Sequence, residues 1–145
     1  MNFAKNIKEC CRDKGLNVKQ LAKLVNIQDS LLYKYINESC TPTVKNVVKL
    51  ADFFETSVDY LLGLSDNEDV KVSKGYSKNV FYLNYEKLLK ENNISHYSVC
   101  QKLKISISSL LSWKKGSLPY LDTLCKLAKY FNTSVDFLIG RADEY

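Results

Sequence analysis

The chain has 145 residues, 46% of them hydrophobic and 26% charged, which is enough to bury a core in one domain or in two small ones. Its formal net charge of +5 permits contact with nucleic acid or with an anionic membrane, but many other proteins share this mild excess. No segment approaches the roughly 18 apolar residues of a membrane helix, and the first residues carry no long apolar run. We therefore expect a cytoplasmic protein with no membrane partner.

The five cysteines and the single histidine indicate neither a disulfide framework nor a metal site. No two cysteines form a CxxC pair, one is left over in any disulfide scheme, and His96 stands alone. We expect reduced, mostly buried thiols, with a thiol sensor as the alternative. Because the chain also lacks a glycine-rich phosphate loop, we expect no enzyme activity, no cofactor and no small-molecule ligand.

The first half of the chain predicts five short helices. Apolar residues spaced by three and four, as at Leu21 and Val25, are typical of helices packed along one side, and no stretch alternates as a strand would. Gly15 has the place of a helix-ending glycine, and Asn17 with Gln20 has the spacing of a capping box. The predicted helices span residues 3–14, 18–25, 29–37, 44–54 and 58–62.

The polar stretch LSDNEDVKVSKGYSKN, residues 64–79, lacks helical periodicity and is predicted to be a linker. The same plan then returns, and ETSVDYLLG at residues 55–63 recurs as NTSVDFLIG at residues 132–140. In both phrases serine can cap the last helix, aspartate favours its positive end, and glycine ends it. A duplicated domain is therefore predicted, with units at 1–63 and 80–145. The helices expected in the second unit span residues 81–92, 96–103, 107–114, 121–131 and 135–139.

Residues 16–42 of the first unit have the spacing of a helix-turn-helix. Ala22 is small enough for a close helix crossing, and Asn26, four residues later, stands where a left-handed turn residue is needed. Leu32 and Tyr35 continue the buried face. In this arrangement the second helix is held outside the body of the domain, where it can enter a major groove.

The chain resembles a tandem pair of lambda-repressor-like domains of the Cro/CI or XRE type. The two stretches PTVKNVVKLADFFETSVDYLLG and PYLDTLCKLAKYFNTSVDFLIG are similar to the fourth and fifth helices of that family. Its helix-turn-helix part is similar to residues 94–116, with Cys100 at the small position, Lys104 at the turn and Trp113 in the core. The resemblance implies an all-α fold of two five-helix domains joined by a polar linker. It also implies a transcriptional regulator, a repressor, that binds double-stranded DNA in the major groove.

Carried over by position, the resemblance implies that the first unit reads bases through its third helix. Glutamine there could address adenine, lysine could address guanine or a phosphate, and the unusual Asp29 could accept from cytosine or weaken binding. These residue types also occur on any solvated helix, so the surrounding domain pattern is what favours DNA contact. The implied base-facing residues are Gln28, Asp29, Ser30, Tyr33 and Lys34, and the implied phosphate contacts are Asn37, Lys45 and Asn46.

The second unit has a less polar face at the equivalent positions. Ile107 and Leu111 could touch thymine methyl groups or mark a protein interface instead. His96 could meet a phosphate or be an ordinary surface histidine. The implied DNA contacts of this unit are Ser106, Ile107, Ser108, Ser112, Lys114 and Lys115.

Two copies in one chain leave several interpretations open. A 16-residue linker reaches about 50 Å when extended, so a covalent pair could meet two half-sites roughly 34 Å apart. Alternatively, the second unit makes a homodimer while the first reads DNA. A protein-interaction module, such as an antirepressor, is a further alternative, because a fold does not fix a function.

Overall fold

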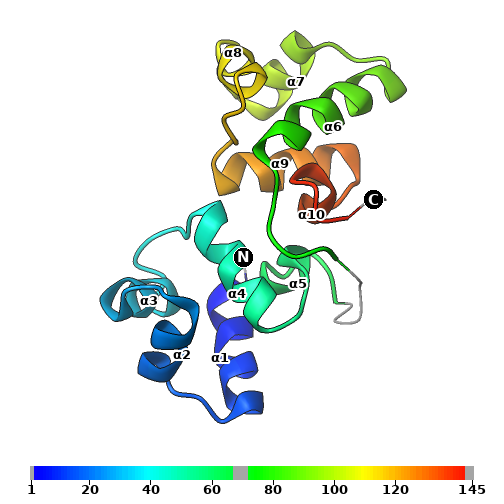
Figure 1. Ribbon diagram of the computed structural model, residues 1–145. Helices are drawn as coiled ribbons and strands as arrows, with labels where there is room; N and C mark the ends of the chain where they lie inside the picture. The colour runs from blue at the N-terminus through cyan, green and yellow to red at the C-terminus, as the bar shows by residue number, and fades with distance from the viewer. Residues whose placement is uncertain (1, 67–71, 143–145) are drawn as a thin grey trace. The chain divides into compact units, whose positions relative to one another are not determined.

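The computed structural model describes residues 2–66 and 72–142, and every regular element in these ranges is an α-helix (Figure 1). The predicted all-α fold is thus confirmed. The chain divides into two compact units, Met1–Lys74 and Gly75–Tyr145, and the division falls inside the stretch predicted as a linker. Within the described ranges, no helix has the length and apolar character needed to cross a membrane.

Five helices form the first unit, and their starts agree with the predicted ones. The last three end one residue earlier than predicted, because Asn37, Phe54 and Leu62 are the capping residues that follow them. The helices are α1 (Phe3–Lys14), α2 (Val18–Val25), α3 (Asp29–Ile36), α4 (Val44–Phe53) and α5 (Val58–Leu61).

The core of the first unit receives at least one fully buried side chain from each helix. Burying a side chain of this size contributes roughly 1.5–3 kcal/mol, which offsets the entropy lost in ordering five short helices. These core residues are Ile7, Leu21, Leu32, Leu50 and Leu61.

Local signals in the sequence place the helix ends as predicted. Gly15 ends α1 in the left-handed conformation, with φ 67°. Asn17 and Gln20 form the capping box, since Asn17 Oδ1 accepts from the Gln20 amide at 2.8 Å and Gln20 Oε1 accepts from the Asn17 amide at 2.9 Å. These two bonds satisfy amides that an uncapped helix start leaves without partners.

The second unit repeats the plan with two differences at helix starts. The helix α6 begins at Lys78, three residues before the predicted start and inside the predicted linker. The predicted helix at 107–114 is wrong at its start, because Ile107 and Ser108 form a turn in which the Ser109 hydroxyl donates to the Ser106 carbonyl at 2.6 Å. The helices are α6 (Lys78–Glu91), α7 (His96–Leu103), α8 (Ser109–Lys114), α9 (Leu121–Phe131) and α10 (Val135–Leu138).

Aromatic side chains fill the core of the second unit. Tyr85 stacks on Phe81 with ring centroids 5.9 Å apart, and it meets Trp113 edge-on at 5.2 Å. Phe131 contributes a further edge contact to Tyr85 at 6.2 Å. Edge-to-face pairs of this kind contribute about 0.5–1.5 kcal/mol beyond the area they bury. This core therefore joins α6, α8 and α9.

The phrase repeated at the end of each unit is a capped final helix. Ser57 Oγ accepts from the Tyr60 amide and Ser134 Oγ accepts from the Phe137 amide, both at 2.9 Å. The glycine that follows each helix has a positive φ, 77° in the first unit and 83° in the second. The predicted serine caps and terminal glycines are confirmed, so the repetition reflects the same local hydrogen bonds used twice.

The second unit contains a buried ion pair that was not predicted from the sequence. Arg141 Nε donates to Asp136 Oδ1 at 2.8 Å, and the two side chains are 1% and 3% exposed. The same guanidinium donates through Nη1 to the Gly75 carbonyl at 3.0 Å. The Ser77 amide nearby donates to the Ile139 carbonyl at 3.1 Å. These bonds attach the segment before α6 to the end of the second unit.

Replacing Arg141 by Met should lower the free energy of unfolding of the second unit by about 3 kcal/mol, because the Asp136 carboxylate loses its buried cation. Urea unfolding of the full chain, followed by the fluorescence of Trp113, the one tryptophan, measures this. Lys126→Met removes the same charge at an exposed position of α9 and should cost less than about 0.5 kcal/mol. Equal effects of the two substitutions would contradict a stabilising role for the pair.

Candidate nucleic-acid interface

In the first unit, α2 and α3 are joined by the turn that the sequence predicted. Asn26 follows α2 in the left-handed conformation, with φ 56° and ψ 48°. The Ile27 amide then donates to the Ala22 carbonyl at 3.0 Å, and the Ile27 side chain is buried. Lys49 Nζ of α4 donates to the Asn26 carbonyl at 3.2 Å. The direction in which α3 leaves the turn is therefore fixed by backbone bonds and by α4.

The helix α3 buries one side and exposes the other. Leu32 and Tyr35 are buried in the core, whereas every residue predicted to face bases is exposed. Asp29 accepts from the Ser30 amide at 2.8 Å, so its carboxylate lies against the positive start of the helix. The exposed residues at this helix are Gln28, Asp29, Ser30, Tyr33, Lys34 and Asn37.

At the start of α4, the two residues predicted to hold phosphates differ in their exposure and in their bonds. Lys45 is exposed, but Asn46 is half-buried and its Nδ2 donates to the hydroxyl of Tyr35 at 2.8 Å. Thr43, which the sequence analysis did not single out, caps α4 by accepting from the Asn46 amide at 3.2 Å. Its position after Pro42 and before an apolar stripe was the available signal. The amide group of Asn46 thus ties α4 to the inner side of α3.

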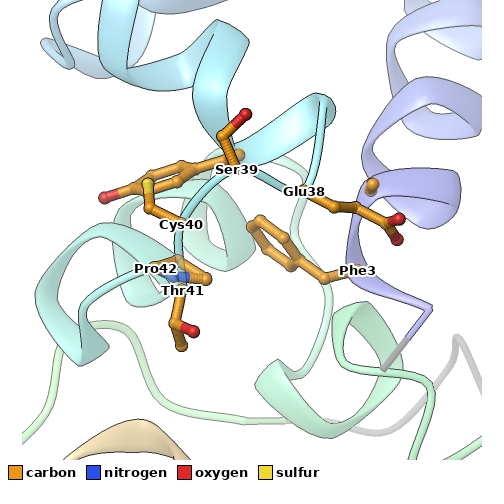
Figure 2. A pocket seen from close by; sticks show the side chains of 8 residues that line it. Phe3, Glu38, Ser39, Cys40, Thr41 and Pro42 are labelled. Atoms are coloured by element: carbon orange, nitrogen blue, oxygen red, sulfur yellow. The ribbon is translucent and has the colours of Figure 1, made fainter.

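The loop between α3 and α4 borders a pocket of about 310 Å³, shown in Figure 2. Phe3 and Ala4 of α1 line one side, and Tyr35 with residues 38–42 of the loop completes it. Glu38, at its rim, has the left-handed φ of 60° that a glycine adopts more easily. None of the residues predicted to face bases lines this pocket, so it is separate from the exposed side of α3.

The second unit has the same turn between α7 and α8. Lys104 is left-handed with φ 58°, and the Ile105 amide donates to the Cys100 carbonyl at 3.0 Å, as predicted for these positions. The serine side chains here bond to each other, with Ser106 Oγ and Ser108 Oγ 2.8 Å apart. All the DNA contacts implied for this unit, and Leu111 with them, are exposed. They are Ser106, Ile107, Ser108, Leu111, Ser112, Lys114 and Lys115.

His96 is a structural residue and not the surface or phosphate-facing histidine that the sequence analysis expected. Its Nδ1 lies 2.7 Å from the Tyr85 hydroxyl and its Nε2 lies 3.1 Å from the Ile107 carbonyl. The Ile107 carbonyl can only accept, so Nε2 is the donor of that bond. Burial raises the pKa of the Tyr85 phenol, so its hydroxyl stays protonated beside Nδ1. His96 thus connects α6 to the turn that precedes α8.

None of the five cysteines, all of which lie in the described ranges, forms a disulfide in the structure. Cys11, Cys100 and Cys125 are buried, Cys10 is half-buried, and Cys40 is exposed. Burial raises the pKa of both the Cys11 and the Cys100 thiols, which keeps them protonated and weakly nucleophilic. Within the described ranges, no three His, Cys, Asp or Glu side chains gather in a way that could hold a metal ion.

Comparison with known proteins identifies both units. The family described as "Helix-turn-helix" matches residues 7–61, and the family described as "Cro/C1-type HTH DNA-binding domain" matches residues 85–144. The chain is 33% identical over 72 residues to the uncharacterized HTH-type transcriptional regulator YobD of Bacillus subtilis (strain 168). That match covers 50% of this chain and 64% of the relative. No solved structure matches the chain significantly.

Replacing Tyr35 by Phe should lower the free energy of unfolding by about 1 kcal/mol, because the half-buried amide of Asn46 loses its acceptor. Urea unfolding followed by far-UV circular dichroism measures the change. Tyr33→Phe removes the same hydroxyl from the exposed side of α3 and should change stability by less than about 0.5 kcal/mol. A smaller effect at Tyr35 than at Tyr33 would show that the bond does not hold α4 against α3.

Proposed function

We propose that this protein, which belongs to the helix-turn-helix proteins of the Cro/C1 type, is a sequence-specific transcriptional repressor whose first unit binds double-stranded DNA. One observation carries the proposal: α3 buries its apolar side in the domain, and its outer side, with the two residues that flank the helix, leaves six polar or amphipathic residues exposed. The major groove admits an α-helix in this arrangement. A protein with this function has to reach DNA inside the cell, which agrees with the cytoplasmic location expected from the sequence.

The exposed side of α3 offers the groups that major-groove recognition uses. The Gln28 amide can both donate to and accept from adenine, and the Lys34 ammonium can donate to guanine. The Asp29 carboxylate can accept only, which suits the amino group of cytosine and repels phosphate. Asp29 is therefore expected to favour one base and to reduce binding to unrelated sequences.

Phosphate contacts are proposed on either side of α3. Asn37, at its end, and Lys45, at the start of α4, are both exposed and carry donors. Asn46 is assigned the bond to Tyr35 and acts by positioning α4. Backbone amides at the start of α4 add partial positive charge beside these residues. Such contacts give affinity and register, while the residues on α3 give sequence preference.

The second unit is proposed to add less to DNA binding. Ser106 and Ser108 bond to each other, which uses the donor of one of the two hydroxyls that could otherwise reach a base edge. Ser112 could still reach a base edge, and Lys114 and Lys115, at the end of α8, carry charges that could lie near phosphates. The two halves of the preferred DNA site should therefore be bound with different affinities, and the first unit should bind its half more tightly.

Protein contact is the second candidate function, and it applies to the second unit. Ile107 and Leu111 are 54% and 63% exposed at the positions that correspond to Asp29 and Tyr33 of the first unit. Exposed apolar side chains on one side of a helix are typical of surfaces that another protein covers. Homodimerisation and contact with a different protein both belong to this candidate.

Selection of bound duplexes from a random pool should yield a sequence preference that depends on the first unit. Lys34→Ala should weaken binding to the selected duplex by about 1–3 kcal/mol if it reads guanine, and relax the preference at one position. Affinity should also fall steeply between about 50 and 200 mM salt. Equilibrium titration of the full chain with labelled duplex measures both effects.

Lys8→Ala is the matched control, because it removes an exposed lysine from α1. It should change affinity much less than Lys34→Ala and leave the selected sequence unaltered. Gln28→Ala combined with Lys34→Ala should abolish the selected preference. If this pair changes nothing while Ser106→Ala combined with Ser112→Ala abolishes it, the assignment of base reading to the first unit is wrong.

A further inference from the structure

We infer that the exposed side of α8 is a docking surface for an acidic amphipathic helix of another protein. The surface consists of the exposed apolar residues Ile107 and Leu111 together with Lys115, and other exposed lysines lie near them in the sequence. The inference deepens the second candidate function, since it names the chemistry of the partner. It does not depend on DNA reading by the first unit, and the two can fail separately.

The two units act as an internal comparison for this surface. They share the helix-turn-helix geometry, yet Asp29 and Tyr33 of the first unit are replaced by Ile107 and Leu111. Both replacements put an aliphatic group on an exposed position, where burial by a partner would contribute roughly 1.5–3 kcal/mol for each side chain. Ile107 lies in the turn that leads into α8, where the Leu110 amide donates to its carbonyl at 3.4 Å, and Leu111 follows on the helix, so both exposed side chains belong to one short segment.

The charged residues next to this apolar pair in the sequence have one sign. In space, however, Glu86 of α6 lies near Lys114, since Lys90 and Lys114 together lower the pKa of its carboxyl. Residues 92–121 contain four lysines and no aspartate or glutamate. All four lysines are exposed, and they flank the pair in sequence on both sides. They are Lys102, Lys104, Lys114 and Lys115. An apolar centre with a cationic rim is complementary to a helix that carries leucine on one side and glutamate beside it.

The same charges argue against a second copy of this chain as the occupant. Two copies docked through the same surface would bring both lysine sets together, and like charges across an interface cost free energy.

DNA fits this side of the unit less well than a protein does. At the start of α9, Asp122 occupies the position that Lys45 has in α4, and Tyr120 replaces Thr43. A carboxylate at that position repels the phosphate that a lysine would attract. Apolar groups at 107 and 111 cannot exchange hydrogen bonds with base edges, although they could touch a thymine methyl group. A protein helix can cover Ile107 and Leu111 with apolar side chains of its own, which a DNA backbone does not offer.

A hydrogen bond and an aromatic contact connect the docking surface to the core of the second unit. His96 Nε2 donates to the Ile107 carbonyl at 3.1 Å, and Trp113 of α8 packs edge-on against Tyr85 in the aromatic core. A surface that is ordered before binding loses little conformational freedom when a partner covers it. The pair of aliphatic residues is small, however, so the expected affinity is that of a transient contact, in the micromolar range.

Fluorescence anisotropy with a synthetic peptide tests the inference. The probe is a labelled helical peptide of about 16 residues, long enough for four turns, with leucine at positions i, i+3, i+4 and i+7 and glutamate at the others. The full chain should bind it with micromolar affinity. Leu111→Gln should weaken this binding at least tenfold, which corresponds to about 1.4 kcal/mol. A peptide with glutamine in place of leucine should not bind.

Leu24→Gln is the matched control variant, since Leu24 is similarly exposed on α2 of the first unit. It should leave peptide binding unchanged, and so should Lys34→Ala, which tests the DNA proposal alone. Far-UV circular dichroism and Trp113 fluorescence verify that Leu111→Gln remains folded. Equal loss of peptide binding in the Leu24 and Leu111 variants, or no binding of the acidic peptide, would overturn the inference.

Two further outcomes would assign the surface to another occupant. If sedimentation shows a dimer that Leu111→Gln dissociates, the occupant is a second copy and the inference is wrong. If Leu111→Gln weakens binding to a selected duplex as much as Lys34→Ala does, the surface lies on DNA and the inference is equally wrong. Unchanged duplex binding together with lost peptide binding supports it.

Discussion

The position of each exposed helix depends on one left-handed residue. Asn26 and Lys104 both adopt φ near 60°, and the amide after each donates back to the small residue of the preceding helix. This geometry changes the direction of the chain within a short turn. The next helix then packs on the domain with one side and leaves its other side exposed. Everything proposed for α3 and α8 requires their outer sides to remain free, and the turn produces that freedom in both units.

The same scaffold carries two surfaces of different chemistry. The first unit has Asp29 and Lys45 where the second unit has Ile107 and Asp122, so the charge at these two exposed positions differs between the units. The core residues of both units are buried alike. Side chains on the exposed side contribute little to stability, so they can change without disturbing the fold. Fold and function are therefore set by separate residues in this protein, and a comparison of the two units separates them directly.

Helix ranges could be predicted because their signals are local. The capping box at Asn17 and the serine at 57 act on amides within three residues, so sequence spacing alone reveals them. Arg141 could not be placed, because its bond to Gly75 joins residues 66 apart. The predicted start of α8 was wrong for a local reason: Ser106 and its neighbours form side-chain bonds within the turn, and these compete with the helix. The exposure of the predicted site residues followed from the helical period, but the bond between Asn46 and Tyr35 could not be predicted, because it joins two different helices.

Polar bonds inside the second unit connect its core to the turn before α8. Tyr85 and His96 stand at the positions of Ile7 and Val18 of the first unit, and Arg141 stands at the position of Leu64, so hydrogen-bonding side chains occupy positions that are aliphatic in the first unit. Buried polar groups gain little net stability, but each is satisfied in few geometries and so favours one arrangement. A base-reading helix can adjust as it enters a groove, whereas a small apolar surface gains affinity chiefly from being ordered beforehand. The polar core of the second unit is thus consistent with a surface that docks a partner helix.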